Sequence, residues 1–203
     1  GLGGVSTAVA DEITTVDEVA EDLGAAVTHR YEPRGTAAEL LAERYDEVLL
    51  SGPAGTGKSR ACLEKLHVMA LLNPGMRALM VRKTAVSLPS TGLVTFREKV
   101  AKEAIAAKDL YWYGGSQSEQ AGYRYSNGSF VAVGGMDNPG KILSGELDGA
   151  FVNQAEELTL SDWEIITTRT TGRAGNVDFG GMTFGDANPG PASHWIKTRS
   201  TLK

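Results

Sequence analysis

A stretch beginning at Gly52 fits the pattern G-x-x-x-x-G-K-[S/T], in which glycines, a lysine and a hydroxyl group act together. Glycines let the backbone wrap around phosphates, so that its N–H groups point inward as an anion nest. Lys58 would reach the outer phosphates as a point charge, and the Ser59 hydroxyl would bind Mg²⁺, which prefers oxygen ligands. The pattern therefore predicts a site for ATP with Mg²⁺, formed by Gly52, Pro53, Ala54, Gly55, Thr56, Gly57, Lys58 and Ser59, with Arg60 directly after it.

The flanking residues supply the elements that such a loop requires. The apolar run at 47–50 predicts a buried strand before the loop, and from Ser59 onward apolar residues recur at helical spacing. A helix that begins at the loop would direct the partial positive charge of its N-terminus at the phosphates. The alternative is a glycine-rich turn between a strand and a helix, with an exposed lysine and no ligand.

A second polar group follows the apolar run at 149–152, which also predicts a buried strand. Enzymes that transfer phosphoryl groups commonly hold Mg²⁺ and position water with acidic side chains at such a strand end. Here the first two polar residues are amides. Asn153 can act on Mg²⁺ through a water molecule, and Gln154 can orient water but cannot take its proton.

The carboxylates nearest to this strand end belong to Glu156 and Glu157. Because a neutral amide cannot serve as a general base, a carboxylate that turns back toward the phosphates must help if water is to be activated. We predict Glu157 first and Glu156 second for this role. Alternatively, both glutamates cap a helix that starts near residues 159–162.

The elements that must position these groups can be predicted from apolar runs and from helical spacing. Strands alternate with helices, which predicts an α/β fold with a central, mostly parallel sheet flanked by helices. Besides the two strands already described, apolar runs predict strands at 78–81 and 182–185. Asn127-Gly128 lies between two further runs rich in β-formers, and this predicts a β-hairpin near 122–134.

Three further helices are expected between residues 36 and 108. The first covers 36–45 with Thr36 as its N-cap, and the second begins at the phosphate loop and is stopped by Asn73-Pro74-Gly75. The third is an amphipathic helix at 93–108, whose apolar positions include Val94, Val100, Ala104 and Ala107.

Composition narrows the class of protein. Of 203 residues, 41% are apolar and 22% are charged, which is typical of a soluble domain, and the formal net charge is −5. Free-standing nucleic-acid-binding proteins usually carry a basic surplus, so the bulk charge does not point to DNA. The single cysteine, Cys62, excludes an internal disulfide framework and indicates a reducing compartment. No signal peptide is evident, and no apolar run approaches the roughly 20 residues of a membrane span.

In their order and spacing, these motifs resemble the ATPase domain of the large terminase subunit of tailed bacteriophages, the motor that packages DNA. The resemblance covers residues 31–197. It implies a P-loop NTPase of the ASCE class with a helicase- and terminase-like sheet, occupying residues 31–203. Residues 1–30 are expected to be a loosely held leader, or to form a short helix over 17–26. Besides the phosphate loop, the resemblance rests on the segments 31–35, 79–84, 135–141, 152–158, 169–173 and 185–195.

The resemblance also implies roles for single residues. Tyr31 and Arg34 would lie near the adenine, because an aromatic face and a guanidinium group both stack on a purine; alternatively, Tyr31 anchors the core. Asn188 would belong to the motif that couples hydrolysis to movement, and its alternative is a plain Asn-Pro turn. His194 and Trp195 are expected to pack rather than to react.

Two departures from the family pattern concern the catalytic groups. The family carries a carboxylate where Gln154 stands, so the residue that activates water differs here. The family also uses an arginine from the neighbouring subunit, just before this strand, and the same region of this chain offers Lys141, which supplies charge without a bidentate fork. Arg169 and Arg173 are therefore rival candidates for that finger.

The resemblance finally implies an assembly. The chain would hydrolyse ATP with Mg²⁺ as a homo-oligomeric ring on the portal, at the procapsid vertex in the host cytoplasm. Its partners would be double-stranded DNA, the portal protein and the small terminase subunit, with no membrane. The family's nuclease domain is expected to be absent from this chain, and nuclease activity with it. The alternatives are a helicase-like or other P-loop ATPase without a packaging role, and a nucleotide-binding scaffold with little hydrolysis.

Overall fold

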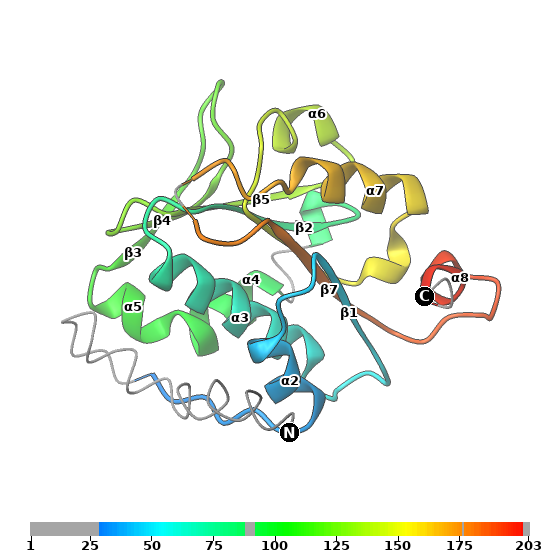
Figure 1. Ribbon diagram of the computed structural model, residues 1–203. Coiled ribbons are helices and arrows are strands. Elements are labelled where there is room, and N and C mark those ends of the chain that lie inside the picture. The colour runs from blue at the N-terminus through cyan, green and yellow to red at the C-terminus, as the bar shows by residue number, and fades with distance from the viewer. Residues whose placement is uncertain (1–28, 88–91, 176, 201–203) are drawn as a thin grey trace, which may run out of the picture.

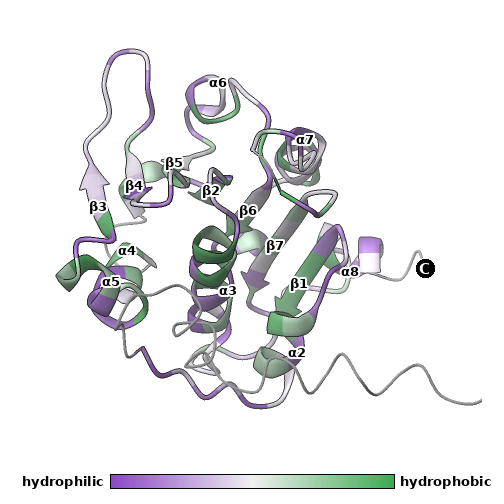
Figure 2. Cartoon of the chain, turned by 60° about the vertical axis from the view of Figure 1, so that its left-hand side comes forward, coloured by the Kyte–Doolittle hydropathy of each residue, from purple (hydrophilic) through white to green (hydrophobic). Residues whose placement is uncertain are grey.

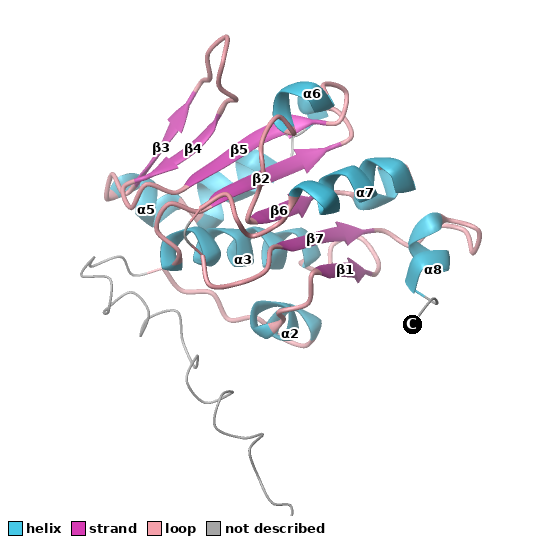
Figure 3. Ribbon diagram, turned by 45° about the horizontal axis from the view of Figure 1, so that its top comes forward, coloured by secondary structure: helices cyan, strands magenta, loops and turns pink. Residues whose placement is uncertain are grey.

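Seven strands build the central sheet of the computed structural model, which describes residues 29–87, 92–175 and 177–200 (Figure 1). Their bounds are β1 (Glu47–Ser51), β2 (Arg77–Arg82), β3 (Leu110–Tyr113), β4 (Gly122–Tyr125), β5 (Phe130–Gly135), β6 (Gly149–Val152) and β7 (Met182–Ala187). The strands lie in the order β1-β7-β6-β2-β5-β4-β3, in which the first five pair in parallel and β4 pairs antiparallel with both β5 and β3 (Figure 3). The parallel strands therefore bring their carboxyl ends to one edge of the sheet.

Helices cover both faces of this sheet, as Figure 1 shows. One face carries α2 (Thr36–Ala42), α3 (Lys58–Leu72), α4 (Gly92–Thr95), a π-helical turn (Phe96–Val100) and α5 (Lys102–Ala106). The other face carries α6 (Pro139–Ile142) and α7 (Leu160–Arg169). The remaining elements are the 3₁₀ turns Ala85–Ser87 and Ala155–Glu157 and the terminal helix α8 (Trp195–Ser200). The predicted class, a mostly parallel sheet flanked by helices, is confirmed.

The strands divide the core into two apolar layers, because neighbouring side chains of a strand point to opposite faces. Met80, Phe151 and Phe184 are buried in the layer that contains α3, whereas Val152 is buried with Trp163 of α7. Figure 2 shows hydrophobic colouring along much of α3, which runs against the sheet. Burial on both faces explains why these strands appear in the sequence as continuous apolar runs.

The four predicted core strands are confirmed as β1, β2, β6 and β7. The expectation that the first of them is buried is wrong, since β1 is the outermost strand of the sheet and none of its residues is buried. The sequence did not predict β3, which pairs with β4 at the other margin. Tyr111 and Trp112 of β3 are both exposed, so this strand lacks the alternation that marks a half-buried strand.

The predicted helix at 93–108 is broken rather than continuous. The Ala101 N–H donates to the Phe96 carbonyl at 2.7 Å, a π-type bond that spans five residues. The extra residue in this turn brings Val100 and Ala101 to the core together, and both are fully buried. Ala107, which was expected on the apolar face, is exposed.

The helix predicted at 36–45 is confirmed as α2, although it ends at Ala42. Its N-cap is Gly35, with φ of 56°, and the prediction of Thr36 as N-cap is wrong because Thr36 is already the first helical residue. Lys65 of α3 satisfies the other end of α2, since its ammonium group donates to the carbonyls of Leu40 and Glu43, both at 2.7 Å.

The predicted hairpin is confirmed as β4 and β5, which pair through Tyr123 and Val131. Gly128 supplies a positive φ of 86° in the turn. The Asn127 amide donates to the carbonyls of Ala70 and Leu71 at 2.8 and 3.0 Å, and so ties the hairpin to the end of α3. Within the described residues, no helix has the length and apolar character needed to cross a membrane. The short helix proposed for 17–26 lies outside the described residues.

Candidate functional site

The loop from Gly52 to Gly57 connects β1 to α3 and forms the predicted strand–loop–helix arrangement. Gly55 and Gly57 have φ of 77° and 81°, in the left-handed region that glycine tolerates without steric cost. Gly57 is also the N-cap of α3, so the free N–H groups of the first helical turn lie at the loop. The Gly52 N–H donates to the Ala187 carbonyl at 3.2 Å, which attaches the loop to the end of β7.

The Lys58 side chain lies across this loop. Its ammonium group donates to the carbonyls of Gly52 and Pro53 at 2.7 and 2.6 Å and to the Thr56 hydroxyl at 3.3 Å. These acceptors are neutral, whereas a phosphate oxygen carries charge and accepts a stronger hydrogen bond. A bound triphosphate would therefore draw the Lys58 ammonium group away from its own loop.

Asp186 of β7 meets the loop from the neighbouring strand, and sequence reasoning assigned it no role. Asp186 is 4% exposed, and its carboxylate accepts a hydrogen bond from the Ser59 hydroxyl. The Asn153 amide donates to its two oxygens at 3.1 and 3.3 Å, and the Gln154 N–H donates to it at 2.9 Å. Asp186 directly follows the predicted strand at 182–185, and this position of a carboxylate is the sequence signal that could have identified it.

The two amides after β6 lie where they were predicted, at the carboxyl edge of the sheet beside the loop. Asn153 is 3% exposed, and its Oδ1 atom is buried without a hydrogen-bond partner among the described residues. Gln154 has φ of 52° and ψ of 59°, a left-handed conformation that is uncommon for a residue other than glycine. Such strain, of order 1–3 kcal/mol, is often found at functional sites.

Glu156 and Glu157 lie in the 3₁₀ turn after β6, and their side chains point to different partners. Glu157 pairs with the Arg82 guanidinium group at 3.0 and 3.2 Å. The Glu156 Oε1 atom accepts from the Asn188 amide at 2.8 Å, whereas its Oε2 atom is buried without a partner among the described residues. The structure therefore joins a candidate base to the proposed coupling residue through a direct hydrogen bond, a contact that the sequence did not predict.

The alternative in which both glutamates cap the next helix is wrong. Helix α7 begins with a capping box formed by Thr159 and Asp162. The Thr159 hydroxyl accepts from the Asp162 N–H at 3.1 Å, and the Asp162 carboxylate accepts from the Thr159 N–H at 2.9 Å. The Lys83 ammonium group also contacts Asp162, and together these donors lower the pKa of this carboxyl against the effect of its burial.

Arg82, at the end of β2, is a second residue that sequence reasoning quoted without giving it a role. Its side chain is 11% exposed, and its guanidinium group donates to the Gln154 side-chain carbonyl and to Glu157. The carboxyl ends of β2 and β6 lie side by side, because these strands pair in parallel. Arg82 therefore places a fixed positive charge beside the residue predicted to position water.

The residues predicted to lie near the adenine are only partly brought together. Tyr31 is half-buried and lies outside the apolar core, so it does not act as a core anchor. The Arg60 guanidinium group stands 5.3 Å from the centre of its ring, and burial raises the pKa of the Tyr31 hydroxyl. Arg34 is exposed.

The three candidate fingers lie at two edges of the sheet. Lys141, on α6, is exposed and follows β5, so it stands at the same edge as the phosphate loop. Arg169 ends α7 at the opposite edge, where its carbonyl accepts from the Leu147 N–H just before β6. Arg173 pairs with Glu146 near the same place, at 3.2 Å. The structure therefore does not bring Arg169 or Arg173 to the phosphate loop of their own chain.

His194 and Trp195 pack, as expected. The Trp195 indole lies 5.5 Å from that of Trp163, and its N–H donates to the Leu158 carbonyl at 2.7 Å. His194 contacts the Glu156 carbonyl at 3.1 Å. Both residues therefore hold the 3₁₀ turn that carries the two candidate carboxylates.

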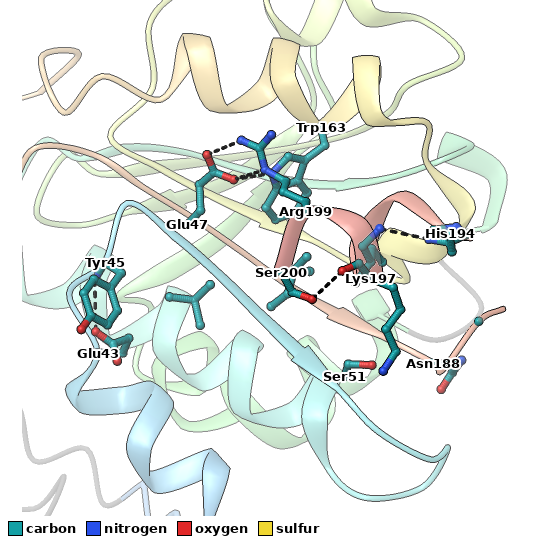
Figure 4. A pocket seen from close by; sticks show the side chains of 14 residues that line it. Glu43, Tyr45, Glu47, Ser51, Trp163, Asn188, His194, Lys197, Arg199 and Ser200 are labelled. Carbon is teal, nitrogen blue, oxygen red and sulfur yellow. Dashed lines mark hydrogen bonds and ion pairs between the residues drawn. The ribbon is translucent and has the colours of Figure 1, made fainter. Parts of the chain in front are cut away.

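A cavity of about 570 Å³ lies apart from the phosphate loop, between β1 and α8 (Figure 4). Figure 4 shows Arg199 of α8 pointing at Glu47, whose carboxylate it contacts at 2.7 Å. The Arg199 guanidinium group lowers the pKa of Glu47, and the Trp163 indole N–H, at 2.8 Å, contributes to this. Ser51 and Asn188 line the side of the cavity nearest to the loop.

The residues around Ser59 fit Mg²⁺ as part of a metal–nucleotide complex. Ser59, Asn153 and Asp186 offer oxygen atoms, the ligand type that this ion prefers, and the Asn153 Oδ1 atom accepts no hydrogen bond from any described residue. The described residues contain no group of three or more His, Cys, Asp or Glu side chains that could bind a metal by themselves. Substrate phosphates and water would therefore complete the coordination.

The phosphate loop and the mostly parallel sheet define a P-loop NTPase fold, and solved phage large terminases share it. The large terminase of a thermophilic bacteriophage gives a TM-score of 0.61 at 15% sequence identity, over 78% of this chain and 37% of that chain. The same terminase in complex with ATP-gamma-S gives 0.57 at 16%, over 80% and 38%. The large terminase ATPase domain of Thermus phage P74-26 gives 0.60 at 19%, over 86% and 69%.

These similarities confirm the fold expected from the motifs, that of a terminase ATPase domain. The chain spans little more than a third of the full large terminase chains from the thermophilic bacteriophage. No protein-family model matches the sequence, and no curated protein matches it.

Proposed function

We propose that this chain is the ATP-hydrolysing motor domain of a phage terminase large subunit, which drives double-stranded DNA into a procapsid. The observation that carries the proposal is the meeting of Ser59 with Asp186, Asn153 and Gln154 at one edge of the sheet. This edge combines a phosphate loop with oxygen ligands and a residue suited to hold water. The terminase-like fold and the order of the motifs supply the packaging context.

In ATP hydrolysis, the side chains at this edge of the sheet would have separate roles. The loop N–H groups and Lys58 bind the phosphates and offset their charge. Ser59, Asn153 and Asp186 would hold Mg²⁺, which when bound would offset further negative charge of the phosphates. Gln154 holds the attacking water, since its backbone is fixed by Asp186 and its side chain by Arg82. A nearby carboxylate takes the proton of that water.

Of the two candidate carboxylates, the structure favours Glu156 over the first choice from the sequence, Glu157. Glu157 is occupied by Arg82 and is partly exposed, so an ion pair must open before it can act. Glu156 has one buried oxygen atom without a partner among the described residues. Its other oxygen accepts a hydrogen bond from Asn188, which follows β7. Proton uptake at Glu156 would therefore change a hydrogen bond made by the proposed coupling residue.

The proposed assembly follows from this role. A ring of copies on the portal, with the portal protein and the small terminase subunit as partners, would act in the host cytoplasm at the procapsid vertex. Lys141 would complete the neighbouring site across the subunit boundary. Binding to a phage portal distinguishes this role from that of a helicase-like ATPase without a packaging function.

The first test replaces the lysine of the loop. Lys58→Ala is expected to lower ATP turnover by at least about 10²-fold, because a preorganised charge next to the phosphates is lost. Phosphate release in the presence of double-stranded DNA measures this rate. Lys102→Ala, an exposed lysine of α5, is the matched control and should retain the wild-type rate. Wild-type turnover in Lys58→Ala would refute the site.

A second candidate function is supported by the two amides after β6. A chain with Asn153 and Gln154 in place of acids can bind nucleotide as a scaffold and hydrolyse it little. Nucleotide binding to the wild-type protein with no turnover, at any protein concentration and with DNA present, would favour the scaffold over the motor.

A further inference from the structure

Asp186 is a buried carboxylate whose partners all belong to the candidate nucleotide site. A carboxylate removed from water is costly unless donors compensate its charge. The donors here are the Ser59 hydroxyl, the Asn153 amide at 3.1 and 3.3 Å and the Gln154 N–H at 2.9 Å. All of these donors are neutral, so within the part of the chain that the structure describes, no cationic side chain is shown in contact with the Asp186 carboxylate.

The place beside Asp186 also contains an acceptor without a donor. Because the Asn153 amide N–H₂ group is committed to Asp186, its Oδ1 atom is fixed in orientation, and this atom is buried with no partner among the described residues. A buried acceptor in this state costs free energy that a donor would recover. Water held on a cation is such a donor, and Mg²⁺ usually keeps several waters while taking one or two protein carboxylates.

We propose that Asp186 of β7 is the carboxylate that holds nucleotide-bound Mg²⁺ beside Ser59, in place of the acid that β6 lacks. This assignment rests on the proposed function. β7 lies between β1 and β6, and Asp186 pairs in register with Leu50, near the start of the phosphate loop. The proposed metal-binding acid thus stands on β7, one strand nearer to the loop than β6, and Asn153 orients it.

The assignment explains why an amide at position 153 is suitable. An aspartate there would put a second carboxylate within hydrogen-bonding distance of Asp186, and like charges at that distance oppose each other. The Asn153 amide instead donates to the carboxylate through N–H₂ and offers Oδ1 to a metal-bound water. The ends of β6 and β7 therefore share one carboxylate, that of Asp186, for the metal.

The test compares nucleotide affinity with and without the metal, using ATP-gamma-S and calorimetry in Mg²⁺ or in EDTA. The wild type is expected to bind more tightly with Mg²⁺. In Asp186→Asn, the factor by which Mg²⁺ increases the affinity for ATP-gamma-S should be about 10–100-fold smaller than in the wild type, which is the usual effect of removing a group that supports a metal. The affinity of this variant in EDTA should stay near that of the wild type. An unchanged Mg²⁺ gain in folded Asp186→Asn overturns the assignment.

Two control variants distinguish an effect on metal binding from an effect on folding. Asp148→Asn removes another buried carboxylate, which accepts from the Arg77 and Ala174 N–H groups at the other edge of the sheet, and it should keep the Mg²⁺ gain. The double exchange Asn153→Asp with Asp186→Asn preserves one carboxylate and one amide, and it should retain part of the gain.

A measurement on the wild-type protein needs no variant. Pulsed electron paramagnetic resonance of Mn²⁺ with ATP-gamma-S, on protein labelled with ¹³C at its aspartate carboxylates, should show a ¹³C coupling to the metal. Absence of this coupling, with the nucleotide bound, overturns the assignment. A wild-type protein that binds no nucleotide in either Mg²⁺ or EDTA refutes the proposed function itself, a result distinct from nucleotide binding without any dependence on the metal.

Discussion

Single residues of the candidate site are held by partners from other strands. Ser59 binds Asp186, and Glu156 binds Asn188. Gln154, in its left-handed conformation, is held by Asp186 through the backbone and by Arg82 through the side chain. A residue fixed at both ends can place a water molecule without reorganising, and such preorganisation is a large term in catalysis.

The carboxylate that activates water can be identified by removing each candidate in turn. Glu156→Gln is expected to lower turnover by at least about 10²-fold with ATP-gamma-S binding retained, because a general base contributes about 10²–10⁴-fold. Glu157→Gln should have a smaller effect, since Glu157 is paired with Arg82. Steady-state and single-turnover kinetics give these rates.

Replacing both glutamates tests the hypothesis more severely. If the double variant turns over ATP at the wild-type rate, neither glutamate is the base, and Gln154 would only position water. Gln154→Glu is the companion variant, in which a carboxylate at the usual family position should preserve or raise the rate.

Among the elements, α3 connects the site to most of the fold. Its first turn closes the phosphate loop, Lys65 in its middle satisfies the end of α2, and Asn127 of the hairpin satisfies its last carbonyls. The buried Glu64 on the same helix binds His29 at 2.9 Å and Arg60, so the segment before the loop is also anchored to α3. A change within α3 is therefore expected to affect the stability of the whole domain.

His67 of α3 predicts how that stability depends on pH. Burial lowers its pKa to about 3, and its Nδ1 atom contacts the Tyr125 hydroxyl at 2.9 Å. Below pH 6.5 the unfolded chain binds a proton at His67 that the folded chain does not, so stability falls as the pH falls toward 3. The slope from one such group is at most about 1.4 kcal/mol per pH unit.

Urea unfolding at several pH values measures this effect. In His67→Gln, which keeps a hydrogen-bonding side chain near Tyr125, the free energy of unfolding should fall less steeply below pH 6.5 than in the wild type. His29 acts in the opposite sense: Glu64 and Glu103 raise its pKa, so its contribution is complete below pH 6.5 and is lost as the pH rises through the raised value. Equal pH slopes in wild type and variant would contradict the His67 assignment.

At the scale of the whole molecule, the sheet brings the phosphate loop, the amides and Lys141 to one edge and leaves Arg169 and Arg173 at the other. A neighbouring copy that approaches this edge could add Lys141 to the site, and a finger supplied by a partner is worth about 10³–10⁵-fold in related phosphoryl transfers. The isolated chain is therefore expected to be a slow ATPase whose rate per molecule rises with protein concentration.

Mixing two inactive variants tests the origin of the finger. Lys58→Ala has a defective phosphate loop but retains Lys141. Lys141→Ala has an intact phosphate loop but lacks the proposed finger. If the finger comes from a neighbour, a mixture of the two should hydrolyse ATP faster than either variant alone. A high rate per molecule that does not change with concentration would count against a finger from another subunit.

The sequence by itself determined the local features of this protein. The phosphate loop, the strands at 47–50, 78–81, 149–152 and 182–185 and the hairpin all depend on neighbouring residues, through glycine conformations and runs of apolar side chains. The broken helix after Gly92 and the strand β3 escaped prediction, because a π-helical turn and an exposed marginal strand depend on what packs against them.

Only the tertiary structure decided which polar groups meet. Ser59 and Asp186 are 127 positions apart, and Arg82 and Gln154 are 72 positions apart. The physical reason is that parallel strands are joined by long crossovers, so their order in the sheet follows from packing of the whole domain rather than from local pattern. The sequence could show that β6 ends without an acid, but only the placement of β7 beside the loop shows that the Asp186 carboxylate meets Ser59 there.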